Sequence, residues 1–224
     1  MSNLGFAKMR RNGCVSVNAV MLPEPEEFEY KVREFLNETI ISECIYYEVR
    51  EKLSRLSLHE FSEIDVNRVI KAFLITWGGM ARVLKRREKW EDKLVAVIKR
   101  YSDFLERVRI MDLANLSIKE LESLQDLIEK CYMEIREVVG PTSASKVLHI
   151  IAPEFFPLWD VNIRKMYKVS DSFRGYFRFM LNIRITWLED SQLMLVLDRL
   201  EKEYDLSKLR LIDIYNFAVT RDSL

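Results

Sequence analysis

The amine of Lys146 and the carboxylate of Asp160 are two groups that could do chemistry together. A lysine whose pKa is lowered in a partly desolvated cleft becomes a nucleophile that forms Schiff bases with carbonyl carbons. A carboxylate beside it can stabilise positive charge or accept a proton. Taken alone, Lys146 fits a solvated helix lysine, and Asp160 fits an ordinary helix cap. A role in catalysis therefore depends on whether the fold brings the two together.

The segment around these residues predicts a helix, a tight turn, a short helix, an apolar loop and a further helix. Gly140-Pro141 stops the first helix, and the turn presents free backbone N–H groups that could bind a phosphate. On the short helix, one stripe must face the core, and it consists of Ala144, Val147, Leu148 and Ile151. Lys146 points off that stripe, and Asp160 stands where an N-cap would sit.

The stretch from Gly140 to Arg164 resembles the helix-hairpin-helix DNA glycosylase superfamily, which includes endonuclease III and 8-oxoguanine glycosylases. The resemblance places Gly140 in the hairpin, Lys146 as the nucleophilic lysine and Asp160 as the catalytic carboxylate. It implies an all-α fold and the excision of a damaged, flipped-out base from DNA through a Schiff base, with AP-lyase activity. Thr142-Ser-Ala-Ser145 stands where that family has paired glycines. The chain lacks a cysteine cluster, so an iron–sulfur cluster is not expected.

The resemblance implies contacts to nucleic acid from the hairpin, and the local excess of basic residues predicts further contacts from the helix after Asp160. Those candidate residues are Gly140, Thr142, Ser143, Ser145, Arg164 and Lys165. Phe156 and Trp159 are candidates to stack on the extruded base, although such an apolar loop more often serves to close a core. His59 and His149 lack metal-ligand spacing, so we expect no metal and no cofactor.

Apolar residues elsewhere recur at helical spacing and predict an all-α fold. The expected helices cover about 24–40, 42–56, 66–84 with a break at Trp77-Gly-Gly-Met80, 88–109, 117–138, 161–167, 173–203 with a break, and 206–219. Ser117 and Glu120 form a capping box, and Asp65 or Asn67 caps the helix that follows it. Residues 1–22 are expected to be loosely ordered, with a short strand over Cys14–Leu22 as one option. Residues 23–224 form a single domain, or two helical subdomains of about 23–110 and 111–224 that flank a cleft.

Composition limits the class of protein. Lys+Arg 35 balances Asp+Glu 35, no apolar run is long enough to span a membrane, and no secretory leader opens the chain, so we expect a cytoplasmic protein. Basic residues gather between Arg82 and Arg100 and between Val161 and Leu188, which favours DNA as the partner. The oligomeric state is left open. A catalytically silent nucleic-acid-binding module and a protein-interaction domain are the alternatives to a glycosylase.

Overall fold

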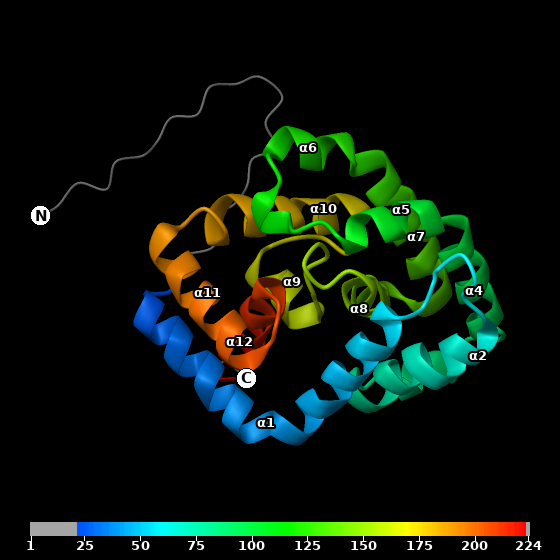
Figure 1. Cartoon of the computed structure of the whole chain (residues 1–224), viewed down its shortest axis with the longest axis horizontal. Helices are drawn as coiled ribbons and strands as arrows, with labels where there is room; N and C mark the ends of the chain where they lie inside the picture. The colour runs from blue at the N-terminus through cyan, green and yellow to red at the C-terminus, as the bar shows by residue number, and fades with distance from the viewer. Residues whose placement is uncertain (1–21, 223–224) are drawn as a thin grey trace, which may run out of the picture.

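The computed structural model describes residues 22–222, apart from the side chains of residues 40–42 and 222, and all regular structure in that range is helical (Figure 1). The predicted all-α class is therefore confirmed. The predictions of a loosely ordered segment over residues 1–22 and of an optional strand over Cys14–Leu22 fall outside the described residues, except at Leu22 itself.

The helices before Gly140 form the first part of the fold. They are α1 (Pro25–Ser54), α2 (Glu63–Asp65), the π-helical turns η1 (Val66–Ile70) and η2 (Phe73–Trp77), α3 (Ala81–Leu84), α4 (Trp90–Arg100), α5 (Ser102–Arg109), the 3₁₀ turn η3 (Leu113–Asn115), α6 (Ile118–Ser123) and α7 (Gln125–Val139). The helices after Gly140 are α8 (Pro141–Ile151), α9 (Val161–Met166), α10 (Phe173–Asn182), the π-helical turn η4 (Ile183–Trp187), α11 (Ser191–Tyr204) and α12 (Lys208–Asp222).

Local sequence signals explain most of these boundaries. Ser117 and Glu120 make the expected capping box at the start of α6. The segment before η1 is capped differently from the prediction, because Ser62 is the N-cap and Asp65 is its reciprocal partner three residues later. The expected break at Trp77-Gly-Gly-Met80 is present. It separates η2 from α3.

Helix α1 is a single element where two helices were expected, but it bends at the expected place. Thr39 has non-helical backbone angles, with φ −118° and ψ 16°, and its hydroxyl donates to the Phe35 carbonyl oxygen at 2.7 Å. Before the bend, Phe28 packs on Tyr215 of α12. After the bend, Tyr46 packs on Phe73 of η2. Helix α1 therefore packs on α12 before its bend and on η2 after it.

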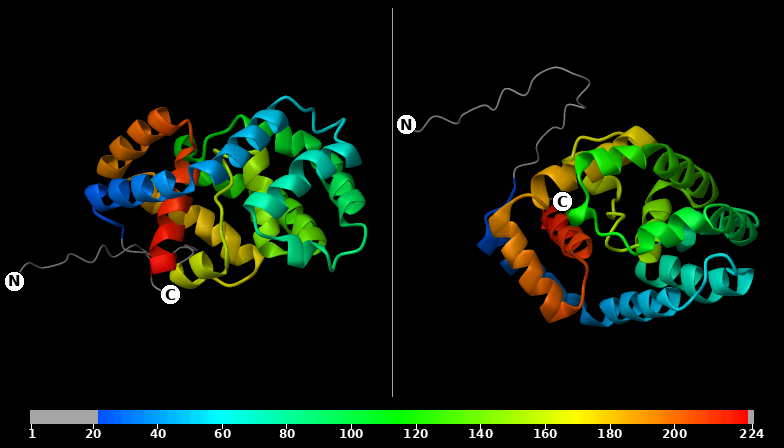
Figure 2. Two further views of the ribbon diagram at one scale, coloured as in Figure 1. Left: turned by 90° about the horizontal axis from the view of Figure 1, so that it is seen from below. Right: turned by 45° about the horizontal axis from the view of Figure 1, so that its top comes forward.

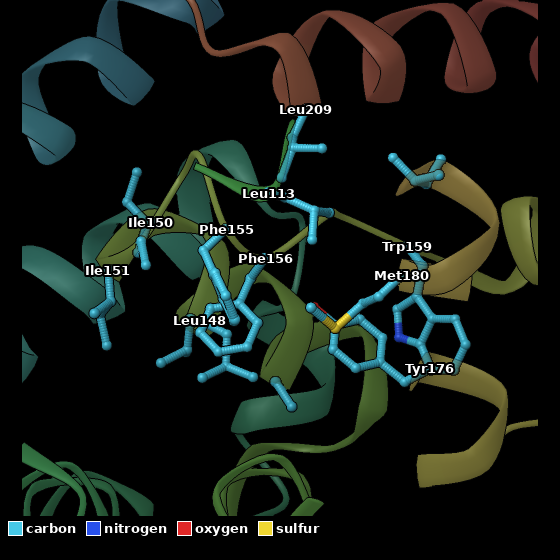
Figure 3. Close-up of a cluster of buried hydrophobic side chains, with 14 of the residues drawn as sticks. Leu113, Leu148, Ile150, Ile151, Phe155, Phe156, Trp159, Tyr176, Met180 and Leu209 are labelled. Carbon is cyan, nitrogen blue, oxygen red and sulfur yellow. The ribbon is translucent and has the colours of Figure 1, made fainter. Parts of the chain in front are cut away.

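Helix α8 lies at the centre of the hydrophobic core. Eight of its eleven residues are buried, and it packs against α7, α1 and η2. Figure 3 shows the loop after α8 entering the same core, with Phe155 and Phe156 beside Leu148, and Trp159 beside Tyr176 of α10. The helix that carries Lys146 is thus packed against neighbours on most sides, which fixes the direction in which Lys146 projects.

Candidate active site

A cavity of about 450 Å³ opens beside Lys146. This volume falls within the range of about 300–1,000 Å³ that is typical of small-molecule sites. The lining residues come from α1, η2, α8, the loop before α9 and α12, and they are Phe35, Thr39, Glu43, Trp77, Lys146, Leu158, Trp159, Asp160, Arg210, Asp213, Phe217 and Arg221. On α1 the lining positions are four residues apart, so they form one face that the bend at Thr39 turns toward the cavity.

Lys146 is tied to the wall of this cavity by one hydrogen bond. Its Nζ donates to the backbone oxygen of Gly78 at 2.8 Å and lies 5.2 Å from the centre of the Trp77 ring. Burial lowers the pKa of the Lys146 amine, while the negative charges of Asp213 and Asp160 oppose that shift. A lysine in this environment reaches its neutral, nucleophilic form more readily than a solvated one.

Asp160 caps α9 and also lines the cavity. Its Oδ1 accepts the backbone N–H groups of Asn162 and Ile163, each at 2.8 Å. No hydrogen bond from the described residues reaches Oδ2. The structural and the chemical interpretations of Asp160 are thus compatible. The structure brings Lys146 and Asp160 to one cavity, as the sequence analysis requires.

A buried ionic cluster forms the floor of the cavity. Arg210 of α12 makes a bidentate pair with Glu43 of α1, with Nη2–Oε1 at 2.6 Å and Nε–Oε2 at 3.3 Å, and it also pairs with Asp213 one turn further along α12. The Trp77 indole N–H donates to Glu43 at 3.3 Å, and the Arg210 guanidinium lies 4.7 Å from the Trp77 ring centre. Burial raises the pKa of Asp213 to about 6, against the lowering effect of Arg210 and Lys146.

Aromatic rings form much of the rest of the wall. Phe35 and Phe217 meet edge to face with their ring centres 5.7 Å apart, and Phe217 is 41% exposed. Trp159 is buried but lines the cavity from the loop before α9. A flat, apolar ligand could therefore stack inside the cavity while its polar edge faces the charged groups.

The glycines after Trp77 shape the wall to which Lys146 binds. A Cβ on Gly78 would lie 2.7 Å from the Leu74 carbonyl oxygen, and Gly79 has a φ of +64°, which side-chain-bearing residues rarely adopt. The two glycines let the chain turn sharply out of η2. That turn leaves the Gly78 carbonyl available to Lys146.

The hairpin residues predicted to contact nucleic acid lie at the start of α8. Gly140 has a φ of +87° and joins α7 directly to α8. Thr142 is half-buried, whereas Ser143 and Ser145 are buried. The Ser145 hydroxyl donates within the protein, to the backbone oxygens of Thr142 at 3.0 Å and Trp159 at 3.1 Å. The hydroxyl of Ser145 thus holds the loop of Trp159 and Asp160 against α8.

The remaining predicted residues divide between surface and core. Arg164 pairs with Asp171 at 2.8 Å and lies over the Trp159 ring, whereas Lys165 is exposed. Phe156 is fully buried and does not line the cavity, and its carbonyl oxygen contacts a ring nitrogen of His149 at 2.7 Å. Of the two candidate stacking residues, only Trp159 reaches the cavity.

Two segments with exposed basic side chains come soon after cavity-lining residues in the sequence, one after Trp77 and one after Asp160. The chain leaves Trp77 through the two glycines and enters a basic segment whose exposed members are Arg82, Lys85, Arg86 and Lys89. None of these four pairs with an acidic residue within the described part of the chain. After Asp160, Lys165 and Lys168 are exposed in the same way. Figure 2 (left) shows α9 beside the C-terminal end of α12.

Sequence reasoning missed Glu43, Trp77, Arg210 and Asp213 as cavity residues. A signal was available for Arg210 and Asp213, because these two residues and Asn216 interrupt the otherwise apolar run from Leu209 to Val219. Charged side chains that are buried in a helix must find partners. The pairing with Glu43, 167 residues earlier in the chain, could not be read from that pattern.

Within residues 22–222, no group of His, Cys, Asp and Glu side chains is arranged to hold a metal ion. Over the same range, every helix is too short or too polar to cross a membrane.

Comparison with known proteins gives one match. A family model described as a family of unknown function, DUF6308, matches residues 83–218, which is more than half of the chain. That span includes Lys146, Asp160, Arg210 and Asp213, whereas Glu43 and Trp77 precede it. No curated protein and no solved structure matches. On the extent of the match, the chain belongs to this family of unknown function.

Proposed function

We propose that this protein acts on DNA as a glycosylase-like enzyme with AP-lyase activity, in which Lys146 attacks the sugar of an extruded nucleotide. The observation that carries the proposal is the setting of Lys146: a partly desolvated amine that faces two carboxylates on an aromatic-lined cavity. Such an amine is suited to attack C1′ of deoxyribose and to form a Schiff base.

The aromatic walls support a nucleobase as the group that enters. Enzymes that act on a base in DNA take it out of the stack and hold it against aromatic side chains in a pocket. Trp77, Phe35 and Phe217 line this cavity from separate elements, and Phe217 is partly exposed. A base that enters past Phe217 would keep a stacking partner along its path.

Asp160 fits the role of an electrostatic partner in this reaction. Positive charge develops at C1′ as the base departs, and a carboxylate nearby stabilises it. The two backbone N–H groups hold Oδ1 in a fixed orientation, which leaves Oδ2 to face the substrate. A carboxylate fixed in this way needs no reorganisation during the reaction.

We infer that phosphates are contacted by two basic segments, each of which follows a cavity-lining residue in the sequence. Arg82, Lys85, Arg86 and Lys89 follow the Trp77 wall, and Lys165 and Lys168 follow the Asp160 wall. Cations without acidic partners are available to neutralise phosphates, which is the main source of affinity for DNA. Acidic residues elsewhere in the chain then balance these basic segments, which accounts for the overall neutral charge.

Borohydride trapping tests the proposal. The panel consists of duplex oligonucleotides that carry an abasic site, 8-oxoguanine, uracil or an oxidised pyrimidine. We expect a covalent adduct with at least one member, because borohydride reduces the Schiff base to a stable amine.

Lys146→Gln should abolish the adduct while leaving the fold intact, since the glutamine amide can still donate to Gly78. Lys119→Gln is the matched control, because it removes an exposed lysine that lies outside the cavity and outside the two basic segments, and it should keep the adduct. Absence of an adduct with every member of the panel, or an adduct that survives Lys146→Gln, would contradict the proposal.

A further inference from the structure

A lysine that is held as an ammonium ion cannot attack carbon, so the proposed reaction needs a group that takes its proton. The groups around the Lys146 amine are Asp160, Asp213 and Glu43, with Arg210 among them. Both oxygens of Glu43 are occupied, since they accept hydrogen bonds from Arg210 and Trp77. Glu43 is therefore the least available of the three carboxylates.

Asp160 and Asp213 each have one engaged oxygen and one that accepts no hydrogen bond from the described residues, and they differ in the donors that engage the first. Oδ1 of Asp160 is held by the backbone N–H groups of Asn162 and Ile163, each at 2.8 Å. Oδ2 of Asp213 pairs with Arg210, but its Oδ1 accepts no hydrogen bond from the described residues and is not sealed from solvent. Asp213 lines the same cavity as Lys146 without pairing with it directly, so we expect the proton to pass between Nζ and this oxygen through one bridging water molecule.

The charges that face Asp213 come from every element packed around it. Arg210 lies on its own helix, Lys146 on α8, Asp160 before α9, Tyr167 at the end of α9, and Glu43 on α1 through Arg210. Burial and Asp160 raise the pKa of Asp213, Arg210 and Lys146 lower it, and the result is about 6. A group with a pKa near the working pH is an efficient proton acceptor and donor.

We propose that Asp213 is the proton shuttle of this site: it takes a proton from the Lys146 ammonium group and later returns it to the sugar ring oxygen. The inference rests on the proposed function and adds to it the residue that activates the nucleophile. Asp160 then keeps the separate role of stabilising positive charge at C1′.

The proposed reaction conserves protons and electrons at each step. Transfer of one proton from Nζ to Asp213 Oδ1 leaves a lone pair on Nζ, which forms the bond to C1′ while the C1′–N bond to the base breaks. The base leaves with those electrons and takes a second proton from Nζ. Asp213 then gives its proton to O4′ as the C1′–O4′ bond breaks, which leaves a protonated Schiff base on Lys146 and restores the Asp213 carboxylate.

Single-turnover cleavage of an abasic-site duplex from pH 5 to pH 9 tests the shuttle. We expect the wild type to show an inflection near pH 6, and Asp213→Asn should remove it and lower the rate at pH 7 by about 10²-fold or more. Asp213→Glu should restore part of the rate, and DNA affinity should change little in either variant. Asp160→Asn, the matched carboxylate variant, should lower the rate but keep an inflection, moved to lower pH because the Asp160 charge helps to raise the pKa of Asp213.

A wild-type pH profile in Asp213→Asn would overturn the inference. If Asp213→Asn fails to fold, Asp213→Glu decides instead, because moving the carboxylate must shift the inflection or lower the rate. A glutamate variant that is folded and indistinguishable from the wild type in both respects would also overturn it.

A probe without DNA separates this inference from the proposed function. Glycolaldehyde with cyanoborohydride labels reactive amines, and peptide mass mapping measures the modification of Lys146. Loss of a nearby negative charge alone would lower the lysine pKa and speed labelling, whereas loss of a shuttle slows it. Slower labelling in Asp213→Asn supports the shuttle even if no DNA reacts, whereas equal or faster labelling overturns it.

Discussion

The replacement of Arg210 by Met should destabilise the fold more than the replacement of an exposed arginine by Met does. Arg210 is 3% exposed, and its two partners, Glu43 and Asp213, are 3% and 8% exposed. Methionine retains much of the apolar stem but removes the charge, so two carboxylates are left beside one another in the interior. Breaking a buried ion pair by removing one partner costs about 3–5 kcal/mol.

That cost is a large fraction of the total stability of a domain, which is about 5–15 kcal/mol. For a chain of this size, each kcal/mol corresponds to about 2–4 °C in Tm, so the expected loss is about 6–20 °C. Without Arg210, the pKa of Asp213 rises further, because the guanidinium is the largest influence that lowers it. Stability gained by protonating Asp213 is present at low pH and is lost as pH rises through that pKa. The loss of stability caused by Arg210→Met should therefore be largest at pH 8 and smaller at pH 5.

Thermal unfolding followed by circular dichroism at pH 5 and pH 8 measures both effects. Arg55→Met is the control, since Arg55 and its partner Glu51 are 74% and 63% exposed. An exposed helical pair of this kind contributes about 0.3–0.5 kcal/mol. The reasoning fails if Arg210→Met lowers Tm no more than Arg55→Met does, or if its deficit grows as the pH falls.

Two further predictions concern buried groups outside the cavity. Burial raises the pKa of Glu154 to about 7, so its ionised form weakens the fold as pH rises through that value. Glu154→Gln should then raise the free energy of unfolding at pH 8, by at most about 3 kcal/mol, and have little effect at pH 4; an equal gain at both values would contradict the assignment. Burial lowers the pKa of His149 to about 3, so it is neutral and accepts the Tyr46 hydroxyl at 2.9 Å. Tyr46→Phe leaves that nitrogen unpaired and should cost about 1–3 kcal/mol in urea unfolding, whereas an unchanged midpoint would refute the hydrogen bond.

Much of the fold could be predicted from local patterns in the sequence. The capping box at Ser117 and Glu120 and the break after Trp77 are local, since they depend on residues within a few positions of each other. The single helix α1 could not be predicted in the same way. Its continuity through Thr39 depends on packing against both α12 and η2, which are distant in sequence.

The candidate site could be predicted only in part, for the same reason. Lys146 and Asp160 are 14 residues apart, and the short segment between them is enough to suggest that they meet. Arg210 and Glu43 come together only because α12 packs on α1. No local pattern encodes that contact. Asp213 was missed as well, since its role depends on the cluster that the contact creates.

The most direct test of the central claim is the site of covalent attachment. An abasic-site duplex is incubated with the wild-type protein and borohydride, the DNA is digested, and the protein is mapped by peptide mass spectrometry. The account predicts a sugar remnant on the peptide that contains Lys146, with fragment ions that place it on that side chain. A remnant on a surface lysine such as Lys165 or Lys85, or on no lysine at all, would contradict it.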